Sequence, residues 1–327
     1  MHSKIKKIGI ITSGGDAPGM NACIRALTRT AAYHKIEVIG FKQGYNGLIE
    51  NNWTDLSSKN VSNIIQRGGT ILKTARSEEF RTFEGRKKAF ENLKLNKIDA
   101  LVAIGGDGTF TGASVFNGEF DFPIIGIPGT IDNDLFGTDN TIGYDTALNT
   151  VVSAVDKIRD TASSHGRLFV IEVMGKDAGL IALRSGIATG AEAILIPETP
   201  TYIEHLLTKL CNDRKNKKPS GIIIVAEGDD FGGAFNVAKA VKKDHPSYDI
   251  RVTVLGHIQR GGSPSAFDRV LASQLGAGAI SALMNGDKNS MVGIINKRIV
   301  LTPFEQAIKH NNKINLGLLE LAEVLAY

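Results

Sequence analysis

Four aspartates stand close together in the segment PGTIDNDLFGTDNTIGYDTA, residues 128–147. Asp132 and Asp134 follow Thr130 within a few positions and flank Asn133. In an extended stretch, side chains two positions apart point the same way, so both carboxylates would face one ligand. We predict that one accepts the proton of a substrate hydroxyl while the other faces a metal, as phosphoryl transfer to an alcohol requires.

The other two aspartates of the segment suit structural roles. Asp139 stands in a GTDN turn, and Asp145 precedes a long helical pattern, where the N-terminus of a helix favours a carboxylate. A solvated loop of Asx turns is the alternative interpretation of the whole segment.

Two glycine-rich turns are suited to binding phosphate. TSGGDAPGMNACIRA, residues 12–26, has a proline just inside a helix start, so bare backbone amides can approach an anion. It matches neither GxxxxGK[ST] nor GxGxxG, which disfavours a P-loop NTPase and an ordinary dinucleotide fold, and a simple strand-to-helix turn is the alternative.

IGGDGTF, residues 104–110, sets Asp107 among three glycines, where a carboxylate can hold Mg²⁺ while amides hold phosphate oxygens. A helix cap is the alternative role for Asp107.

A further segment, LGHIQRGGSPSAFDR, brings cations to a glycine turn. His257 and Arg260 stand beside a glycine pair, and Arg251 lies just upstream. Guanidinium groups, an imidazole and backbone amides in one segment predict a binding site for a sugar phosphate.

The elements that position these turns follow from the hydrophobic pattern. Short β-branched runs alternate with segments of helical period, which predicts βα units and a mostly parallel sheet covered by helices. We expect helices over residues 20–33 and 147–158, and strands near residues 8–11, 38–41, 100–104, 124–127, 168–173, 193–196, 222–226, 252–255 and 291–295. The glycine-rich turns fall at the carboxyl ends of these strands, the edge at which open α/β sheets bind ligands.

The composition sets limits on the class of protein. At 327 residues the chain exceeds the usual size of one hydrophobic core, so two domains are expected. Hydrophobic residues make up 42% and charged residues 22%, and no run reaches the length of a membrane helix. A net charge of +4 is too small to indicate nucleic acid, whereas anionic small molecules fit. Cys23 and Cys211 form no CxxC pair, so we expect no zinc site and a cytoplasmic location.

Six motifs, TSGGDAPGMN, GGDGT, PGTIDND, SSHGR, EVMGKDAG and VLGHIQRGGSP, resemble in order and spacing the bacterial ATP-dependent 6-phosphofructokinases over nearly the whole chain. The resemblance implies two Rossmann-like three-layer α/β/α domains with an active site in the cleft between them. It implies transfer of the γ-phosphoryl group of Mg-ATP to the 1-hydroxyl of fructose 6-phosphate, the committed step of glycolysis, by a homotetramer. A larger ATP-binding domain would take residues 1–142 and about 258–309, and a smaller sugar-phosphate domain residues 143–257 and about 310–327.

The resemblance also assigns roles to individual residues. Asp132 would be the general base, and the catalytic group around it would comprise Thr130, Asp134, Lys176 and Arg76. The ATP site would comprise Gly15, Arg76, Ser77, Gly106, Asp107, Gly108 and Thr109, with Asp107 toward Mg²⁺. The sugar-phosphate site would comprise Thr130, Ile131, Asp132, Arg167, Met174, Gly175, Lys176, Glu227, Arg251, His257, Ile258, Gln259 and Arg260, with Arg167 and Arg251 reaching in from a neighbouring subunit. An effector pocket for ADP, GDP or phosphoenolpyruvate would draw on Arg25, Arg29, Arg159, Glu192 and Lys218.

Four positions depart from the pattern of the well-studied bacterial members. Lys176 stands where they carry arginine, so a point charge replaces a planar fork and we expect weaker clamping of the transition state. Ser77 replaces an aromatic residue, which alters the packing of adenine. Ser58 and Asn216 replace basic residues of the effector pocket, so we expect weaker phosphate binding there.

Two glycines bear on the phosphoryl donor. Pyrophosphate-using relatives carry an aspartate where this chain has Gly108 and a lysine where it has Gly129. The aspartate would crowd and repel the α-phosphate of ATP, so both glycines predict ATP. The alternatives are a pyrophosphate-dependent phosphofructokinase, a non-catalytic sugar-phosphate sensor, and an NAD or lipid kinase, which would share GGDGT but lack the TIDND and HIQRGGS loops.

Overall fold

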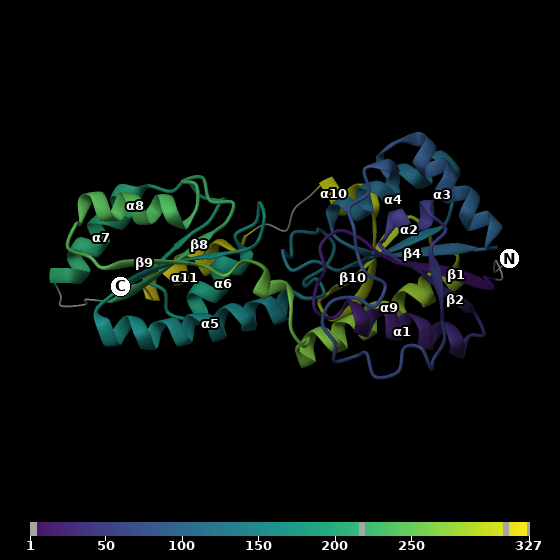
Figure 1. The fold of residues 1–327 in the computed structure, drawn as a ribbon, viewed down its shortest axis with the longest axis horizontal. Coiled ribbons are helices and arrows are strands. Elements are labelled where there is room, and N and C mark those ends of the chain that lie inside the picture. Colours follow the sequence, from purple (N-terminus) through teal and green to yellow (C-terminus); the bar gives the residue numbers. More distant parts are fainter. Residues whose placement is uncertain (1–4, 216–219, 310–313, 326–327) are drawn as a thin grey trace. The chain divides into compact units, whose positions relative to one another are not determined.

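A computed structural model describes residues 5–215, 220–309 and 314–325. Its contacts divide the chain into two compact units, residues 1–146 with 260–312 and residues 147–259 with 313–327. The division falls after Thr146, in the first turn of helix α5 (Tyr144–His165). Each unit consists of one sheet with helices on both faces (Figure 1), so the predicted α/β class with mostly parallel sheets is confirmed.

The sheet of the first unit has seven strands in the order β11-β10-β5-β4-β1-β2-β3. They are β1 (Lys7–Thr12), β2 (Glu37–Phe41), β3 (Trp53–Leu56), β4 (Ala100–Gly105), β5 (Ile124–Pro128), β10 (Ser290–Ile295) and β11 (Arg298–Pro303). All pairs are parallel except the two at the edges, β2 with β3 and β10 with β11. Every residue of β4 and β5 is buried, as expected for strands covered on both faces.

The helices of the first unit form two layers. On one face α1 (Met20–Tyr33) packs against α9 (Ala266–Asn285), and the predicted helix over residues 20–33 is confirmed. The other face carries α2 (Tyr45–Ile49), the 3₁₀ turn η1 (Glu79–Arg81), α3 (Phe83–Leu95), α4 (Asp107–Phe120) and α10 (Phe304–Lys309) (Figure 1). The core beneath this second layer contains several aromatic side chains, among them Phe41, Phe80, Phe110, Phe116 and Phe304.

The sheet of the second unit has four parallel strands in the order β7 (Ala193–Leu195), β8 (Gly221–Ala226), β6 (Leu168–Val173) and β9 (Ile250–Val254). Helices α7 (Ile203–Lys215) and α8 (Ala234–Asp244) cover one face. Helices α5, α6 (Leu180–Ala188) and α11 (Leu316–Leu325) lie on the other, and the 3₁₀ turn η2 (Gly256–Arg260) follows β9 (Figure 1).

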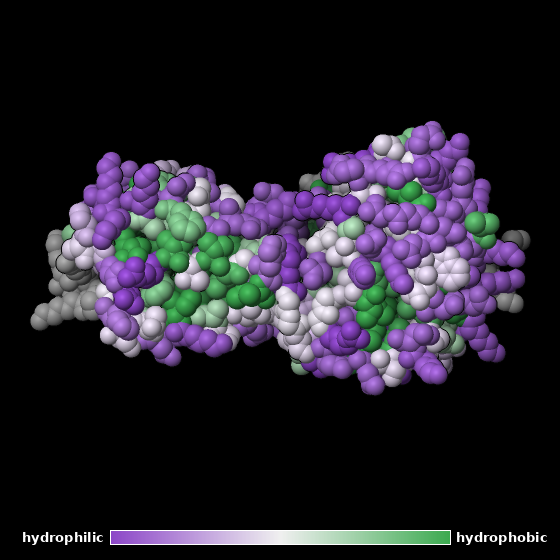
Figure 2. Space-filling model, viewed as in Figure 1, coloured by the Kyte–Doolittle hydropathy of each residue, from purple (hydrophilic) through white to green (hydrophobic). Residues whose placement is uncertain are grey.

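Hydrophilic residues cover much of the surface drawn in Figure 2, and hydrophobic residues gather on one face of the second unit. Large apolar side chains that are exposed in that unit include Phe235 at 68% and Val254 at 48%. Exposed apolar surface of this kind is typical of contact sites. Within the part of the chain that the structure describes, no helix combines the length and the apolar character that crossing a bilayer needs.

The two cysteines differ in environment, which predicts different reactivity. Cys23 on α1 is fully buried, and burial raises the pKa of its thiol, so it stays protonated at neutral pH. Cys211 on α7 is partly exposed. We expect iodoacetamide at pH 8 to label Cys211 in the native protein and both cysteines only after denaturation, as read by mass spectrometry of peptides. Native labelling of Cys23 at the rate of Cys211 would contradict the packing of α1.

Candidate active site

The strand order of the first unit brings three predicted loops together. Strands β5, β4 and β1 are neighbours and run parallel, so the loops that follow them meet at one edge of the sheet. The amide of Ser13 donates to the carbonyl of Ile104 at 3.0 Å, and the amide of Gly129 donates to the carbonyl of Gly105 at 2.9 Å. The strand order reverses between β1 and β4, the point at which α/β sheets bind ligands. The loops after β1, β4 and β5 therefore lie together at the carboxyl ends of the strands, the edge that the sequence predicts.

The loop after β1 presents bare backbone to a guanidinium group. Gly14 and Gly19 have φ of 83° and 113°, a conformation that favours glycine. At Gly15 a Cβ atom would lie 2.5 Å from Nη1 of Arg260, and this nitrogen donates to the carbonyl of Asp16 at 3.2 Å. Gly15 and Arg260, predicted for different ligands, thus lie side by side, where amides and a cation can bind an anion together.

Asp107 opens helix α4 rather than capping it. The N-cap position is Gly106, and the helix start shows no side-chain cap, so the capping interpretation is wrong. The amides of Asp107 and Gly108 lie in the first turn, where a helix has no carbonyl of its own to accept from them. Space beside Gly108 is open, since a Cβ atom there would meet nothing within 4 Å. This helix start therefore offers one carboxylate, free amides and room for a phosphate chain.

The loop after β5 is not extended at the two candidate carboxylates. Asn133 has φ of 54°, so the prediction of an extended stretch with Asp132 and Asp134 on one side is wrong. The Asn133 side chain accepts from the amide of Thr141 at 2.7 Å and bends the loop back on itself. Asp132 is buried, and its amide donates to the hydroxyl of Thr130 at 3.2 Å. Sequence reasoning missed Asn133, because its partner is set by the folded loop and not by spacing.

The two remaining aspartates of this loop have structural partners, as predicted. Asp139 accepts from the amide of Asn296 at 2.8 Å, in the turn between β10 and β11. Asp145, in the first turn of α5, accepts from the hydroxyl of Ser265 at 2.5 Å.

The segment that carries the other ATP-site candidates lies against the loop after β1. The hydroxyl of Thr74 donates to the carbonyl of Gly14 at 2.7 Å, two residues before Arg76. Arg76 itself is exposed. The hydroxyl of Ser77 accepts from the amide of Phe80 at 3.2 Å, so this side chain supports the turn η1.

In the second unit the loops after β6, β8 and β9 also meet, because β6 lies between β8 and β9. One oxygen of Glu227 accepts from the amides of Gly175 and Lys176 at 3.2 and 2.7 Å. Gln259 is fully buried and accepts from the amide of Met174 at 3.2 Å, so its side chain positions this turn and is not itself open to a ligand. The Lys176 side chain is 59% exposed.

The turn η2 completes this group of loops. His257 and Ile258 are both exposed. The side-chain amide of Gln259 donates to the carbonyl of Gly256 at 3.0 Å. Exposed side chains on a turn held by a buried glutamine suit contact with a ligand. The turn therefore offers an imidazole beside the Met174–Lys176 backbone.

Two arginines of the second unit share one aspartate. Arg167 donates from Nε to Asp249 at 2.7 Å, and Nη2 of Arg251 lies 3.1 Å from the same carboxylate. The hydrogen bond from Arg167, together with the positive charge of Arg251, lowers the pKa of Asp249 below its ordinary value. Arg167 precedes β6, whereas Met174 follows it, so the arginines and the Met174–Lys176 turn lie at opposite ends of a six-residue strand. Sequence reasoning missed Asp249.

Two of the predicted effector residues, Arg159 and Glu192, lie together in the second unit. Arg159 on α5 donates to the carbonyls of Thr189 and Gly190 at 2.6 and 2.9 Å and lies 3.8 Å from Glu192. Arg25 and Arg29 lie on α1 of the first unit. Lys218 and Asn216 lie outside the described residues.

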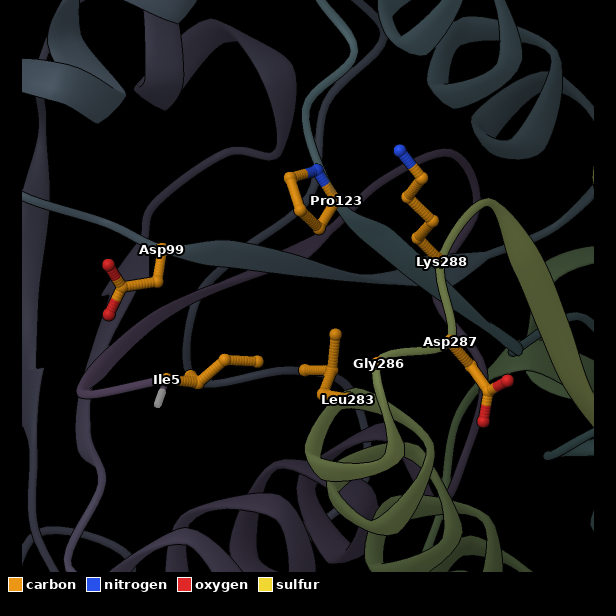
Figure 3. Close-up of a pocket in the computed structure, with 7 residues that line it drawn as sticks. All are labelled: Ile5, Asp99, Pro123, Leu283, Gly286, Asp287 and Lys288. Carbon is orange, nitrogen blue, oxygen red and sulfur yellow. The ribbon is translucent and has the colours of Figure 1, made fainter. Parts of the chain in front are cut away.

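A pocket of about 270 Å³ in the first unit is separate from these loops (Figure 3). Its lining includes Asp99 and Pro123, which precede β4 and β5, so it lies at the amino ends of the strands. It contains none of the predicted site residues. Among residues 5–215, 220–309 and 314–325, no three histidine, cysteine or acidic side chains gather as a metal site.

Comparisons with known proteins give consistent matches. The family model described as "Phosphofructokinase" matches residues 7–283. The ATP-dependent 6-phosphofructokinase 2 of Bacteroides thetaiotaomicron is 57% identical over 322 residues, which cover 98% of this chain and 99% of that protein. The phosphofructokinase structure from Saccharomyces cerevisiae matches with a TM-score of 0.88 and 39% identity, over 93% of this chain and 45% of that chain. A pyrophosphate-dependent phosphofructokinase from Marinobacter aquaeolei matches with a TM-score of 0.84 at 23% identity, over 96% of this chain and 86% of that chain, which shows a shared fold alone.

Proposed function

Because this chain belongs to the phosphofructokinase family, we propose that it transfers the γ-phosphoryl group of ATP to the 1-hydroxyl of fructose 6-phosphate. The observation that carries the proposal is the meeting of the loops after β1, β4 and β5 at one edge of the sheet. These loops hold a phosphate-binding turn, a carboxylate at a helix start and a buried aspartate. Together they supply what phosphoryl transfer to an alcohol needs.

The chemistry assigned to the chain is mainly positioning and proton transfer. Asp132 accepts the proton of the attacking hydroxyl, and the Thr130 hydroxyl, which accepts from the amide of Asp132, holds the backbone at this position. Asp134 is assigned, within the same proposal, a role toward the transferring phosphoryl group and the metal. Lys176 and Arg76 are both exposed. Their positive charges would stabilise the negative charge that develops on the phosphoryl group in the transition state.

The residues at the start of α4 fit a bound Mg²⁺ ion. Mg²⁺ takes one or two protein carboxylates and completes its shell with water and substrate phosphates, so a single carboxylate at Asp107 is sufficient. When bound, the ion would neutralise charge on the phosphate chain. The amides of Asp107 and Gly108, together with Gly15 and Gly106, would hold the phosphate oxygens. Thr109, predicted for the same site, is buried and already donates from its amide to Gly106 and from its hydroxyl to Ser13.

The two glycines that bear on the donor differ in the structure. The open space at Gly108 gives no packing reason for glycine, which supports a role in leaving room for the α-phosphate of ATP. At Gly129 a Cβ atom would lie 2.9 Å from Ile104, so packing alone explains this glycine. The proposal of ATP as donor therefore depends on Gly108 and on the 57% identical relative.

Loops of the second unit would bind the sugar phosphate. The candidates there are Met174, Gly175, Lys176, Glu227, His257 and Ile258. Arg167 and Arg251 lie about 20 Å from the Met174–Lys176 turn of the same chain, the length of a six-residue strand. They would reach the same sugar phosphate only from another subunit, which supports an oligomer, as does the exposed apolar surface of the second unit. That the oligomer is a homotetramer is part of the proposal.

Effector binding remains a further part of the proposal. Arg25, Arg29, Arg159, Glu192 and Lys218 would bind ADP, GDP or phosphoenolpyruvate. The Arg159 guanidinium already holds two backbone carbonyls, so it offers an anion fewer free donors than its charge suggests. A cytoplasmic location also stays a prediction.

A coupled assay tests the proposed function. The full chain with fructose 6-phosphate, Mg²⁺ and ATP should give fructose 1,6-bisphosphate and ADP, with pyrophosphate much less effective as donor. Equal or better use of pyrophosphate would contradict the donor. NAD phosphorylation in place of sugar phosphorylation would contradict the acceptor, and ligand binding without ADP release would indicate a sensor. Repeating the assay with ADP and phosphoenolpyruvate tests the effector residues.

A further inference from the structure

A buried carboxylate outside the predicted site connects two helix starts. Asp268 on α9 is fully buried. One of its oxygens accepts from the amide of Gly143 at 2.9 Å, and the other accepts from the amide and the hydroxyl of Thr146 at 2.8 and 2.5 Å. Burial raises the pKa of Asp268, and the hydrogen bonds from Thr146 and Gly143 oppose that rise. Asp268 thus acts as an N-cap for α5 although it belongs to another helix.

The contact is reciprocal. Ser265 is the N-cap of α9, and its hydroxyl accepts from the amide of Asp268 at 3.2 Å. The same hydroxyl donates to Asp145 in the first turn of α5, and the amide of Ser265 donates to the hydroxyl of Thr146 at 2.9 Å. Each helix therefore supplies groups to the start of the other, so the beginnings of α5 and α9 are fixed together.

This pair of helix starts fixes the end of the loop that carries Asp132. The loop leaves β5 at Gly129 and returns beside it, where Gly129 and Ile142 form a parallel bridge. Just before that bridge, the hydroxyl of Thr141 donates to the carbonyl of Thr130 at 2.6 Å. Gly143 follows at once, with φ of 102° and its amide on Asp268. The hydrogen bonds of Asp268 hold the end of this loop, where the chain passes into α5, whereas β10 and the turn after it hold the loop near Asp139.

Gly143 also lies against the phosphate-binding turn after β1. A Cβ atom at Gly143 would lie 2.7 Å from the Cβ of Ala17, so the Ala17 side chain packs directly against the backbone of Gly143. A shift of Gly143 would therefore move the loop of Asp132 relative to the turn that is proposed to bind phosphate. An error of about 1 Å in such a placement can cost ~10²-fold in rate.

We propose that Asp268 is a positioning residue for phosphoryl transfer, which holds Gly143 and Thr146 so that Asp132 is correctly placed toward the acceptor hydroxyl. The inference rests on the proposed function, because it assigns Asp268 a part in that reaction. Asp268 itself touches neither substrate, and it acts only through the loop. Its removal should therefore lower kcat more than it raises either KM.

The test uses Asp268→Asn in the full chain, alone and combined with Asp132→Asn. Asparagine keeps the volume and one acceptor oxygen but turns an NH₂ group toward the donors of Thr146. We expect kcat for fructose 6-phosphate phosphorylation to fall by ~10- to 100-fold in the parent background. In the Asp132→Asn background we expect no further fall, because the base that Asp268 positions is already absent.

Two controls separate positioning from loss of stability. Thr82→Ala removes the N-cap of α3, whose hydroxyl accepts from the amide of Gly85 at 3.1 Å, in the same unit but away from the loop. It should lower the urea midpoint with little change in kcat. Thr146→Ser keeps the hydroxyl on Asp268 and should retain kcat, whereas Thr146→Val should lose it in the same way as Asp268→Asn.

Hydrogen exchange provides a readout without catalysis. In Asp268→Asn the amides of Gly143 and Thr146 should exchange faster, while those of α3 stay protected. An unchanged kcat, or an equal fold-loss in both backgrounds, would overturn the positioning role. If the unsubstituted protein does not phosphorylate fructose 6-phosphate, the proposed function itself is overturned. The assay of the unsubstituted protein therefore distinguishes this result from failure of the positioning role.

Discussion

Asp132→Asn is expected to lower kcat by ~10²–10⁴-fold, the usual contribution of a positioned general base. Asparagine has nearly the same shape and keeps the backbone amide on the hydroxyl of Thr130, so the loop should retain its form. What it loses is the ability to take a proton from the attacking hydroxyl. The KM for fructose 6-phosphate should change far less than kcat, because the base acts mainly in the transition state. Steady-state kinetics with the coupled assay measures both quantities.

The matched control lies in the same loop. Asp139→Asn makes the same chemical change at a carboxylate whose partner is the amide of Asn296, and asparagine can still accept that hydrogen bond. We expect a kcat close to that of the parent protein. If Asp132→Asn left kcat unchanged and altered only KM, or if both variants lost activity equally, Asp132 would not be the base.

Most of the fold was predictable because hydrophobic patterns record burial. The strands of the parallel core appear in the sequence as short apolar runs, and every residue of β4 is indeed buried. The two antiparallel edge strands, β3 and β11, were not predicted, since their residues are largely exposed and no helix follows β10 before β11. The turn between β10 and β11 contains Asn296 and Lys297, with φ of 49° and 65°, the conformation of a type I′ hairpin. The turn was not recognised because it has lysine at its second position, whereas Asn-Gly is the usual sequence of such a hairpin turn.

The site was predictable at the level of loops and less so at the level of single partners. Glycine at a strand end is visible in a sequence, and the parallel strand order then brings the loops to one edge. Asn133, Asp249 and Asp268 were missed because each depends on a partner that only the fold supplies. Asp268 accepts a hydrogen bond from the amide of Gly143, which lies 125 positions away along the chain. Gln259, conversely, was predicted to bind substrate from its motif, but its side chain is buried and supports the turn.

Gly108→Asp is expected to remove most activity with ATP while leaving the fold intact. A side chain at Gly108 meets open space, and a carboxylate in the first turn of α4 interacts favourably with the helix dipole, so the melting temperature should not fall. A carboxylate about 4 Å from a phosphate at an effective dielectric constant of about 20 is repelled by ~4 kcal/mol, which is ~10³-fold in kcat/KM for ATP. Pyrophosphate has no α-phosphate, so activity with pyrophosphate should fall much less. The measurement compares kcat/KM for the two donors.

Gly118→Asp distinguishes the position of the charge from its presence. Gly118 lies on the same helix, and a Cβ atom there also meets nothing within 4 Å, so the same carboxylate is added away from the first turn. Gly108→Ala adds a side chain at the first turn without charge, and it should cost far less than Gly108→Asp. If Gly118→Asp matched the loss at Gly108, the effect would come from net charge or stability. If Gly108→Asp kept full activity with ATP, the phosphate chain would not pass this helix start, and Asp107 would lose its proposed role toward Mg²⁺ as well.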